Sequence, residues 1–211
     1  MDFGAVHIEG IRRVSALDIS FAEELGYRIK LLGIAREISG GVEVRVHPAM
    51  VPKGALLAAV EGVFNAVLVE GDFAGTIFLQ GRGAGAGPTA SAVVADLIDL
   101  SRGASIPVFG ARMVALADSP AVPMQKHVGA FFLRLMVVDQ PGVLADVTAI
   151  LRDCNGSLES MLQHGRAPGE AVPIVLVTHE TSEAAMSQAI ARIGKLASVL
   201  EAPALIRIEP G

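Results

Sequence analysis

Two turns in the sequence place glycine directly before a predicted helix, an arrangement that suits the binding of an anion. The first is the glycine-rich segment of residues 81–87, and the second is residues 139–144, which read Asp-Gln-Pro-Gly-Val-Leu. Glycine has no Cβ, so its backbone can approach a ligand closely. The first amides of a helix have no partner within the helix and carry the positive end of its dipole. Each turn could therefore hold a ligand or serve only as a tight structural turn.

The glycine-rich segment lies between a predicted strand, residues 76–80, and a helix that we expect to open at Pro88 and to reach about Ser101. Proline suits the first helical turn because its missing amide is not needed there. A dinucleotide-binding fingerprint needs a second parallel strand that ends in an acidic residue about twenty positions later, whereas this helix leads into a predicted linker. From the residues alone, a turn that packs helix and strand closely is favoured over a ligand contact.

The second turn could bind an amino acid, which carries a carboxylate and an ammonium group. Free amides at Gly142, Val143 and Leu144 would receive the carboxylate at the start of the helix. Asp139 could accept a hydrogen bond from the ammonium group or from a threonine hydroxyl. In the alternative, Asp139 only caps the helix and Gly142 only eases the turn, and chemistry alone does not decide between these interpretations.

Other residues of catalytic type are scattered along the chain. The five histidines occur singly, so structural or solvent-exposed roles are predicted for them, and His47 is expected to close a strand. A single cysteine, Cys154, excludes an intramolecular disulfide and favours a reducing, cytoplasmic setting. No His and Cys residues have the spacing of a zinc site, so no metal is predicted.

The composition is that of a globular chain. It has 211 residues, of which 52% are hydrophobic, and a formal net charge of -5, which suits one or two domains. No basic patch argues for nucleic acid as a partner. The first residues do not follow the signal-peptide pattern, and no apolar run reaches about 18 residues, so no membrane segment is predicted.

The elements before residue 103 predict a mixed or antiparallel sheet with few helices. Ser15 and Asp18 resemble a capping box at the start of a short helix that ends at Gly26. Period-two patterns and turn residues then predict two hairpins. The first pairs residues 28–37 with 42–47, and the second pairs 63–69 with 75–80.

Residues 103–130 are rich in Gly, Pro, Ser and Asp without a sustained period, which is typical of a linker. After the linker the order becomes βαββαβ, the ferredoxin-like arrangement of an α+β domain. Its helices would cover one face of a four-stranded sheet and leave the other for a second copy or a partner domain. The expected elements are strand 131–138, helix 143–155, strands 157–164 and 172–179, helix 182–195 and strand 203–208.

Several motifs resemble the later half of the catalytic domain of homoserine dehydrogenases. They occur in the order of that family, at residues 6–11, 16–19, 24–33, 46–48, 62–67 and 83–93. Residues 139–145 are similar to the ligand-loop signature of ACT domains, and the fused order matches bacterial enzymes with a C-terminal ACT domain. The resemblance thus implies a catalytic and dimerisation segment over 1–102, a linker over 103–130 and an ACT domain over 131–211.

The resemblance implies NAD(P)-dependent interconversion of L-homoserine and L-aspartate 4-semialdehyde, on the pathway to threonine, isoleucine and methionine. In the family, an N-terminal Rossmann domain holds the nicotinamide, and a lysine assists proton transfer. Both are expected upstream of residue 1, because Lys30 and Lys53 do not stand in the lysine motif. We therefore predict no catalytic residue within the chain, no tight NAD(P) binding by it and no activity when it is alone.

The resemblance also assigns ligands to the two glycine turns. The glycine-rich loop of these enzymes returns toward the nicotinamide, so Gly83 and Gly85 are predicted to approach the cofactor through their backbone atoms. In the ACT domain, threonine is the expected effector, bound by Asp139, Gly142, Val143 and Leu144.

Effector sites of ACT domains usually form between two paired domains, which implies a homo-oligomer, a dimer or a tetramer, assembled through the sheet and the ACT domains. Candidates for contacts from a neighbouring strand are Ser157, Gln163 and His164, whereas Glu159 and Met161 are expected to be sheet residues. Two other interpretations stay open. The chain could be a free-standing amino-acid sensor with a dimerisation domain, or a subunit that complements a separate nucleotide-binding chain.

Overall fold

The computed structural model describes residues 3–104, 119–165 and 167–211. The chain divides into two compact units that do not follow its order. The first unit combines Met1–Lys53 with Pro120–Gly211, and the second is Gly54–Ser119. Residues 105–118 of the predicted linker lie outside the described residues. Among the described helices, none has the length and apolar character needed to cross a membrane.

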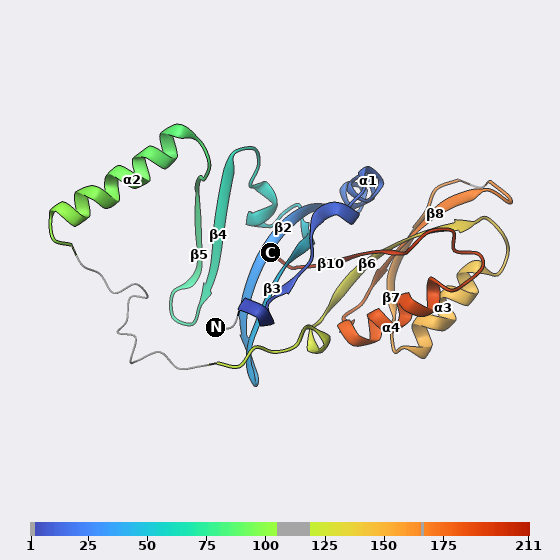
Figure 1. Cartoon of the computed structure of the whole chain (residues 1–211). Helices are drawn as coiled ribbons and strands as arrows, with labels where there is room; N and C mark the ends of the chain where they lie inside the picture. The colour runs from blue at the N-terminus through green and yellow to red at the C-terminus, as the bar shows by residue number, and fades with distance from the viewer. Residues whose placement is uncertain (1–2, 105–118, 166) are drawn as a thin grey trace. The chain divides into compact units, whose positions relative to one another are not determined.

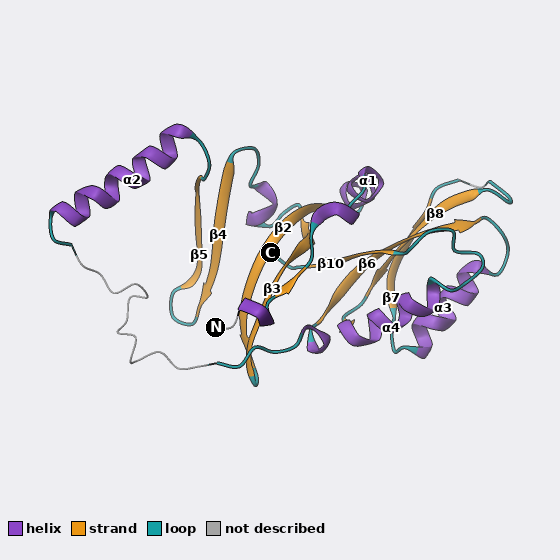
Figure 2. Cartoon of the chain, viewed as in Figure 1, coloured by secondary structure: helices purple, strands orange, loops and turns teal. Residues whose placement is uncertain are grey.

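The first unit is built on a mixed sheet with the strand order β1-β3-β10-β6-β8-β7, in which β2 also pairs with β3 and the short β9 pairs with β6 (Figure 2). The strands β1 and β10 run parallel to β3, and the other neighbours are antiparallel. The strands are β1 (His7–Ile8), β2 (Tyr27–Ile38), β3 (Gly41–Pro52), β6 (Val128–Val138), β7 (Leu158–Gln163), β8 (Ala171–Thr178), β9 (Thr181–Ser182) and β10 (Ala204–Ile208).

The hairpin β2–β3 confirms the first predicted strand pair, with Ile38 opposite Gly41 at its turn. The prediction that His47 closes the strand is wrong, because β3 continues to Pro52, which lies opposite Tyr27. Pro48 fits inside this strand for a local reason. On the side away from β2, β3 pairs with β1 up to Val46 and with β10 from Ala49, so the missing proline amide falls between the two partners.

The elements β6, α3 (Val143–Asp153), β7, β8, α4 (Glu183–Ile193) and β10 confirm the predicted βαββαβ order. Their strands are arranged β10-β6-β8-β7 with antiparallel neighbours, which is the ferredoxin-like sheet. Both helices pack on the same face of this sheet (Figure 1). The core on that face includes Phe131, Leu133 and Leu135 of β6, Val147 and Leu151 of α3, and Met186 and Ile193 of α4.

The opposite face of the ferredoxin-like sheet is covered by α1 (Ala16–Glu24), which comes from the start of the chain (Figure 1). Phe21 of α1 packs in one cluster with Phe132, Val175 and Ile206 of the sheet. Met50 of β3 joins the same cluster. The face that the sequence left open for a partner is thus occupied, at least in this region, by a helix of the same chain.

The predicted capping box of α1 is confirmed. The Ser15 hydroxyl accepts from the Asp18 amide at 3.2 Å, and the Asp18 carboxylate accepts from the Ser15 amide at 2.8 Å. After the helix, Gly26 has φ +86, the left-handed conformation that often follows a helix C-terminus. The turn chemistry therefore fixes both ends of α1.

The second unit contains η3 (Leu56–Ala59), β4 (Phe64–Gly71), β5 (Gly75–Arg82) and α2 (Ala86–Ser101). The antiparallel pair β4–β5 confirms the second predicted hairpin. The helix α2 begins at Ala86, slightly before Pro88, which therefore lies in the first turn, where proline is tolerated. The unit exposes many apolar side chains, among them Val67, Phe73, Ile77, Leu79, Val93 and Leu97.

Candidate functional site

The turn before α3 has a backbone shaped by Gly142. This residue is the N-cap of α3 with φ +95 and ψ -23, a left-handed conformation that a side chain would strain. No side chain among the described residues caps the helix, and the first amide bonded inside it is that of Asp146, which donates to the Gly142 carbonyl at 3.0 Å. The amides of Val143 and Leu144 at this helix start are therefore available to an anion.

Asp139 does not cap α3. Its Oδ2 accepts from the Ala167 amide at 2.8 Å, and its backbone joins the same loop, with its amide donating to Glu170 and its carbonyl accepting from Gly169. The interpretation of Asp139 as a simple helix cap is thus wrong. Among the described residues, the other carboxylate oxygen, Oδ1, has no hydrogen-bond partner, so it remains able to accept from a ligand.

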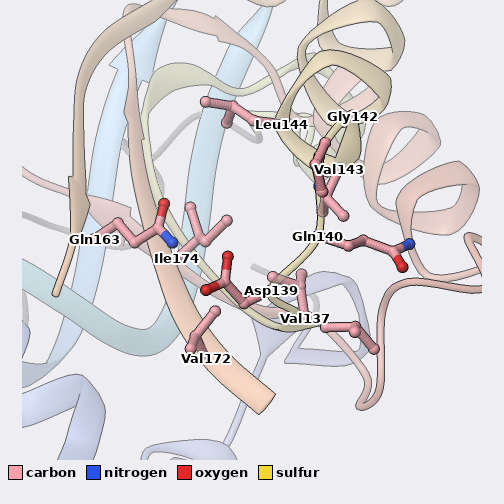
Figure 3. Close-up of a pocket in the computed structure, with 11 residues that line it drawn as sticks. Val137, Asp139, Gln140, Gly142, Val143, Leu144, Gln163, Val172 and Ile174 are labelled. Carbon is pink, nitrogen blue, oxygen red and sulfur yellow. The ribbon is translucent and has the colours of Figure 1, made fainter. Parts of the chain in front are cut away.

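A small pocket of about 220 Å³ lies between α3 and the sheet (Figure 3). It brings together all four residues predicted to bind the effector. In Figure 3 the Asp139 carboxylate and the Gln163 amide lie on one side of the pocket, whereas the Gln140 side chain points away from both. Besides Gln140, the lining is Val137, Val138, Asp139, Pro141, Gly142, Val143, Leu144, Gln163, Val172 and Ile174. The polar groups of Asp139 and Gln163, together with the apolar side chains beside them, suit a small zwitterion with a short side chain.

The three candidate contact residues of the neighbouring strand separate in the structure. Gln163, at the end of β7, lines the pocket. His164 instead stacks on Phe21 of α1, with ring centroids 5.6 Å apart, and Ser157 lies before β7, where its carbonyl accepts from His179. Neither of these two residues lines the pocket.

Gly83 and Gly85 occupy the loop between β5 and α2, and a side chain would be disfavoured at each position for a different reason. Gly85 is the N-cap of α2 with φ +126, and no described side chain caps the helix. At Gly83, a Cβ would lie 2.2 Å from Nδ2 of Asn65, so the β4 side chain would have to move. The loop therefore presents bare backbone at a helix start, which fits an approach to a cofactor, but both glycines also have structural roles.

A buried charge network in the first unit was missed by sequence reasoning. The guanidinium of Arg45, fully buried on β3, pairs with Glu43 and with Glu209, the latter at 2.7 Å. The Arg45 Nε donates to His47 Nε2 at 3.0 Å, and His127 Nδ1 lies 2.9 Å from Glu43. Alternating polar residues at 43, 45 and 47 were the signal, but in a strand pattern they resemble a solvent-facing side.

His47 is neutral in this arrangement. Its Nε2 accepts from Arg45, so its Nδ1 must carry the proton that it donates to the Pro48 carbonyl at 3.0 Å. Burial lowers the pKa of His47, and the positive charges of Arg207 and Arg45 lower it further, against the Pro48 hydrogen bond and the charge of Glu209. The network therefore joins β3 to Glu209, which directly follows β10.

The two lysines before the linker, Lys30 and Lys53, both lie in the first unit. Lys53 donates to the Glu23 carbonyl at 2.7 Å, and Lys30 lies on β2. No group of three or more His, Cys, Asp or Glu residues among the described ones could hold a metal ion.

Comparison with known families divides the chain in two. The homoserine dehydrogenase family model matches residues 1–98, and the ACT domain model matches residues 131–198. The βαββαβ fold and the pocket beside α3 therefore belong to an ACT domain.

Curated relatives match nearly the whole chain. The homoserine dehydrogenase of Neisseria gonorrhoeae is 43% identical over 99% of this chain and 49% of its own length, and that of Pseudomonas aeruginosa is 40% identical over 99% and 50%. A crystal structure of a homoserine dehydrogenase from Thiobacillus denitrificans has a TM-score of 0.88 at 45% identity and covers 100% of this chain and 49% of its own. The chain is similar to homoserine dehydrogenases over nearly all of its length, and it spans about half the length of the curated relatives it matches.

Proposed function

We propose that the chain is part of an NAD(P)-dependent homoserine dehydrogenase that interconverts L-homoserine and L-aspartate 4-semialdehyde, on the pathway to threonine, isoleucine and methionine. The observation that carries this proposal is similarity to homoserine dehydrogenases over 99% of the chain. Residues 1–102 would contribute to the catalytic and dimerisation domain, residues 103–130 would connect it to the regulatory domain, and residues 131–211 would form that domain.

The nicotinamide cofactor would accept or donate the hydride, and this chain would supply one wall of its site. Gly83 and Gly85 would approach it through backbone atoms, because the loop carries no side chain at these positions and precedes the helix α2. The chain alone would not bind NAD(P) tightly and would not catalyse the conversion of L-homoserine. In support, the described strands of the second unit form only an antiparallel pair, not a parallel βαβ unit.

The ACT domain would bind a small amino acid, for which we propose L-threonine. The carboxylate would receive the amides of Val143 and Leu144, and Gly142 leaves room for its approach. Oδ1 of Asp139 would accept from the ammonium group or the hydroxyl. The apolar walls from Val137, Val172 and Ile174 would exclude a second charged group.

The homo-oligomer that the family resemblance implies would assemble through the sheet and the ACT domains. Apolar side chains that are exposed on β4, β5 and α2 support an interface on the second unit, since a surface of this kind is costly in water. Within the first unit, β7 ends the described sheet and offers an unpaired strand edge.

Activity is tested by measuring homoserine-dependent NADP reduction with the chain alone and with a chimera that joins it to the remaining half of the Neisseria gonorrhoeae relative. We expect no turnover from the chain alone and turnover, inhibited by threonine, from the chimera. Turnover by the chain alone would disprove the proposed dependence on a separate nucleotide domain. An inactive chimera that still binds threonine would favour a free-standing sensor, a function consistent with a pocket lined only by residues 137–174.

Effector binding is tested by calorimetric titration of the chain with L-threonine, L-isoleucine and L-methionine. We expect threonine to bind and Asp139→Ala to weaken it by about tenfold or more, as for the loss of one charge-assisted hydrogen bond. Asp146→Ala is the matched control, because it removes an exposed carboxylate from the first turn of the same helix but does not line the pocket. Equal losses in the two variants would show that only the charge near the helix matters and would contradict a direct contact with Asp139.

A further inference from the structure

The end of β7 faces two different parts of the molecule. Side chains alternate along a strand, so Gln163 lines the pocket while its neighbours Leu162 and His164 face the opposite side of the sheet. On that side, Leu162 packs against the cluster formed with α1. The His164 ring stacks on Phe21, with an interplanar angle of 8°. Three consecutive residues thus connect the pocket to α1.

A hydrogen bond also joins His164 to the end of α1. His164 Nε2 lies 2.8 Å from Oε2 of Glu24, the last residue of the helix. Because both side chains are about half exposed, this bond alone contributes little to stability. Together with the stacked ring, it fixes the position of α1 relative to β7.

The loop that follows His164 is held by the polar residue of the pocket. Asp139 accepts from Ala167 through its side chain and exchanges two backbone hydrogen bonds with the same loop. A ligand that engages the Asp139 carboxylate therefore acts on a group that already positions this loop. The loop and Gln163 flank His164 on either side in the chain, so His164 is expected to respond to both.

The helix α1 belongs to the segment that matches the homoserine dehydrogenase family, and it is connected to the β2–β3 hairpin of the same segment. It is anchored to the ACT sheet by the buried pair of Asp18 and Arg134, with Nε and Oδ1 2.6 Å apart. It leads directly into β2 at Tyr27, and Lys53, which follows β3, donates to the Glu23 carbonyl. A shift of α1 must therefore be accommodated by the β2–β3 hairpin.

We propose that the contact of His164 with Phe21 and Glu24 couples occupancy of the ACT pocket to α1 and hence to the dehydrogenase segment. This inference rests on the proposed effector function and adds the route of its regulation. His164 is a positioning residue in this scheme and does not touch the ligand. The coupling requires that the ligand bind one arrangement of β7 and α1 better than another.

The test is hydrogen–deuterium exchange of α1 in the 211-residue chain, with and without L-threonine. We expect saturating threonine to slow exchange in α1 by about fivefold or more, the lower range of measured couplings. Glu24→Ala and His164→Ala each remove one partner of the contact and should reduce the effect to less than about twofold. Threonine should still bind both variants. Because coupling is reciprocal, the loss of threonine affinity in each variant should not exceed the factor by which threonine slows α1 exchange in the parent chain.

His179→Ala is the matched control, since it removes an exposed histidine that follows β8 and should leave the response unchanged. Glu24→Ala alters only a surface side chain at the end of α1, so a loss of the response in this variant is not explained by misfolding. If threonine binds but α1 exchange does not change, or if the change persists in both variants, the coupling is disproved and the effector function stands.

A second arm needs no ligand. Asp139→Ala releases the Ala167 amide, so we expect it to speed α1 exchange severalfold in the parent chain and to have no further effect in a His164→Ala background. An unchanged α1 in Asp139→Ala would disprove the coupling, whether or not threonine binds. If no amino acid binds the chain at all, the effector proposal fails while this arm still decides whether the pocket and α1 communicate.

Discussion

At the scale of single residues, the buried Arg45 of the first unit is paired with groups of opposite charge. Arg45 is fully buried and is compensated by two glutamates and a neutral histidine. Unpaired buried charges cost several kcal/mol, so such a network is stable only when each member has its partners. The neutrality of His47 is one of these conditions, since a proton there would add a positive charge beside Arg45.

The lowered pKa of His47 makes stability depend on pH in a defined direction. As pH falls below the ordinary value of 6.5, the unfolded chain binds a proton at this site before the folded chain does, so stability is lost toward acid. We expect His47→Gln, which keeps one donor and one acceptor, to flatten the dependence between about pH 7.5 and about pH 5.5 by at most about 1.4 kcal/mol per pH unit. Urea unfolding at both pH values measures this dependence. If the free energy of unfolding changed with pH equally in the parent chain and in His47→Gln, a neutral His47 would be contradicted.

At the scale of elements, the first turn of α1 combines a helix cap with a buried ion pair. Its first turn is closed by the capping box, and the same Asp18 carboxylate pairs with Arg134 on β6. The pair lies beside the apolar cluster of Phe21 and Phe132, so it fixes how the helix sits on the sheet. A capping residue that also forms a buried ion pair links the local start of a helix to its tertiary packing.

Removal of Arg134 should therefore be costly. Arg134→Met leaves the Asp18 carboxylate buried without its cation, and we expect the free energy of unfolding to fall by about 3 kcal/mol. Restoring neutrality with the double variant Asp18→Asn, Arg134→Met should recover part of this loss. Arg152→Met, which removes an exposed partner of Asp153, serves as the control and should leave stability unchanged in the same urea titrations. If Arg134→Met and Arg152→Met lowered the free energy of unfolding equally, burial of the Asp18–Arg134 pair would not determine its contribution to stability.

At the scale of the whole molecule, the spatial units cut across the family segments. The start of the homoserine dehydrogenase match, up to Lys53, forms one unit with the ACT domain, whereas Gly54–Ser119 is separate. The parallel pairing of β3 with β10, which in turn pairs with β6, continues the sheet from the homoserine dehydrogenase match into the ferredoxin-like fold. The ACT domain is therefore not a simple appendage at the end of a linker.

An ACT fragment of residues 128–211 should consequently be less stable than the intact chain. It would expose Phe132, Val175 and Ile206, each worth about 1.5–3 kcal/mol when buried, so the free energy of unfolding should fall by at most about 9 kcal/mol. Thermal unfolding and binding of a hydrophobic dye would measure the change. Replacing Gly54–Ser119 by a flexible linker is the control, since α1 then stays on the sheet. A fragment that melts at the temperature of the intact chain would contradict this prediction.

The sequence by itself determined the types of the elements, because period-two and helical patterns, caps and glycine turns act within a few residues. It therefore predicted both hairpins, the βαββαβ order and the capping box, and its motifs identified the family. It also placed the candidate effector residues in one turn, which the structure finds together in a pocket with Gln163. The binding roles of these residues, like those of Gly83 and Gly85, remain predictions.

Only the tertiary structure decided which distant residues meet. Arg134 pairs with Asp18 across 116 positions and Arg45 with Glu209 across 164, and no local pattern specifies such partners. The one available signal was the unbroken apolar run from Phe131 to Leu133, which is typical of a strand buried on both faces. Even that signal does not say what covers the second face, because any apolar surface of the right shape could do so. The chain resolves this choice by folding α1 onto it.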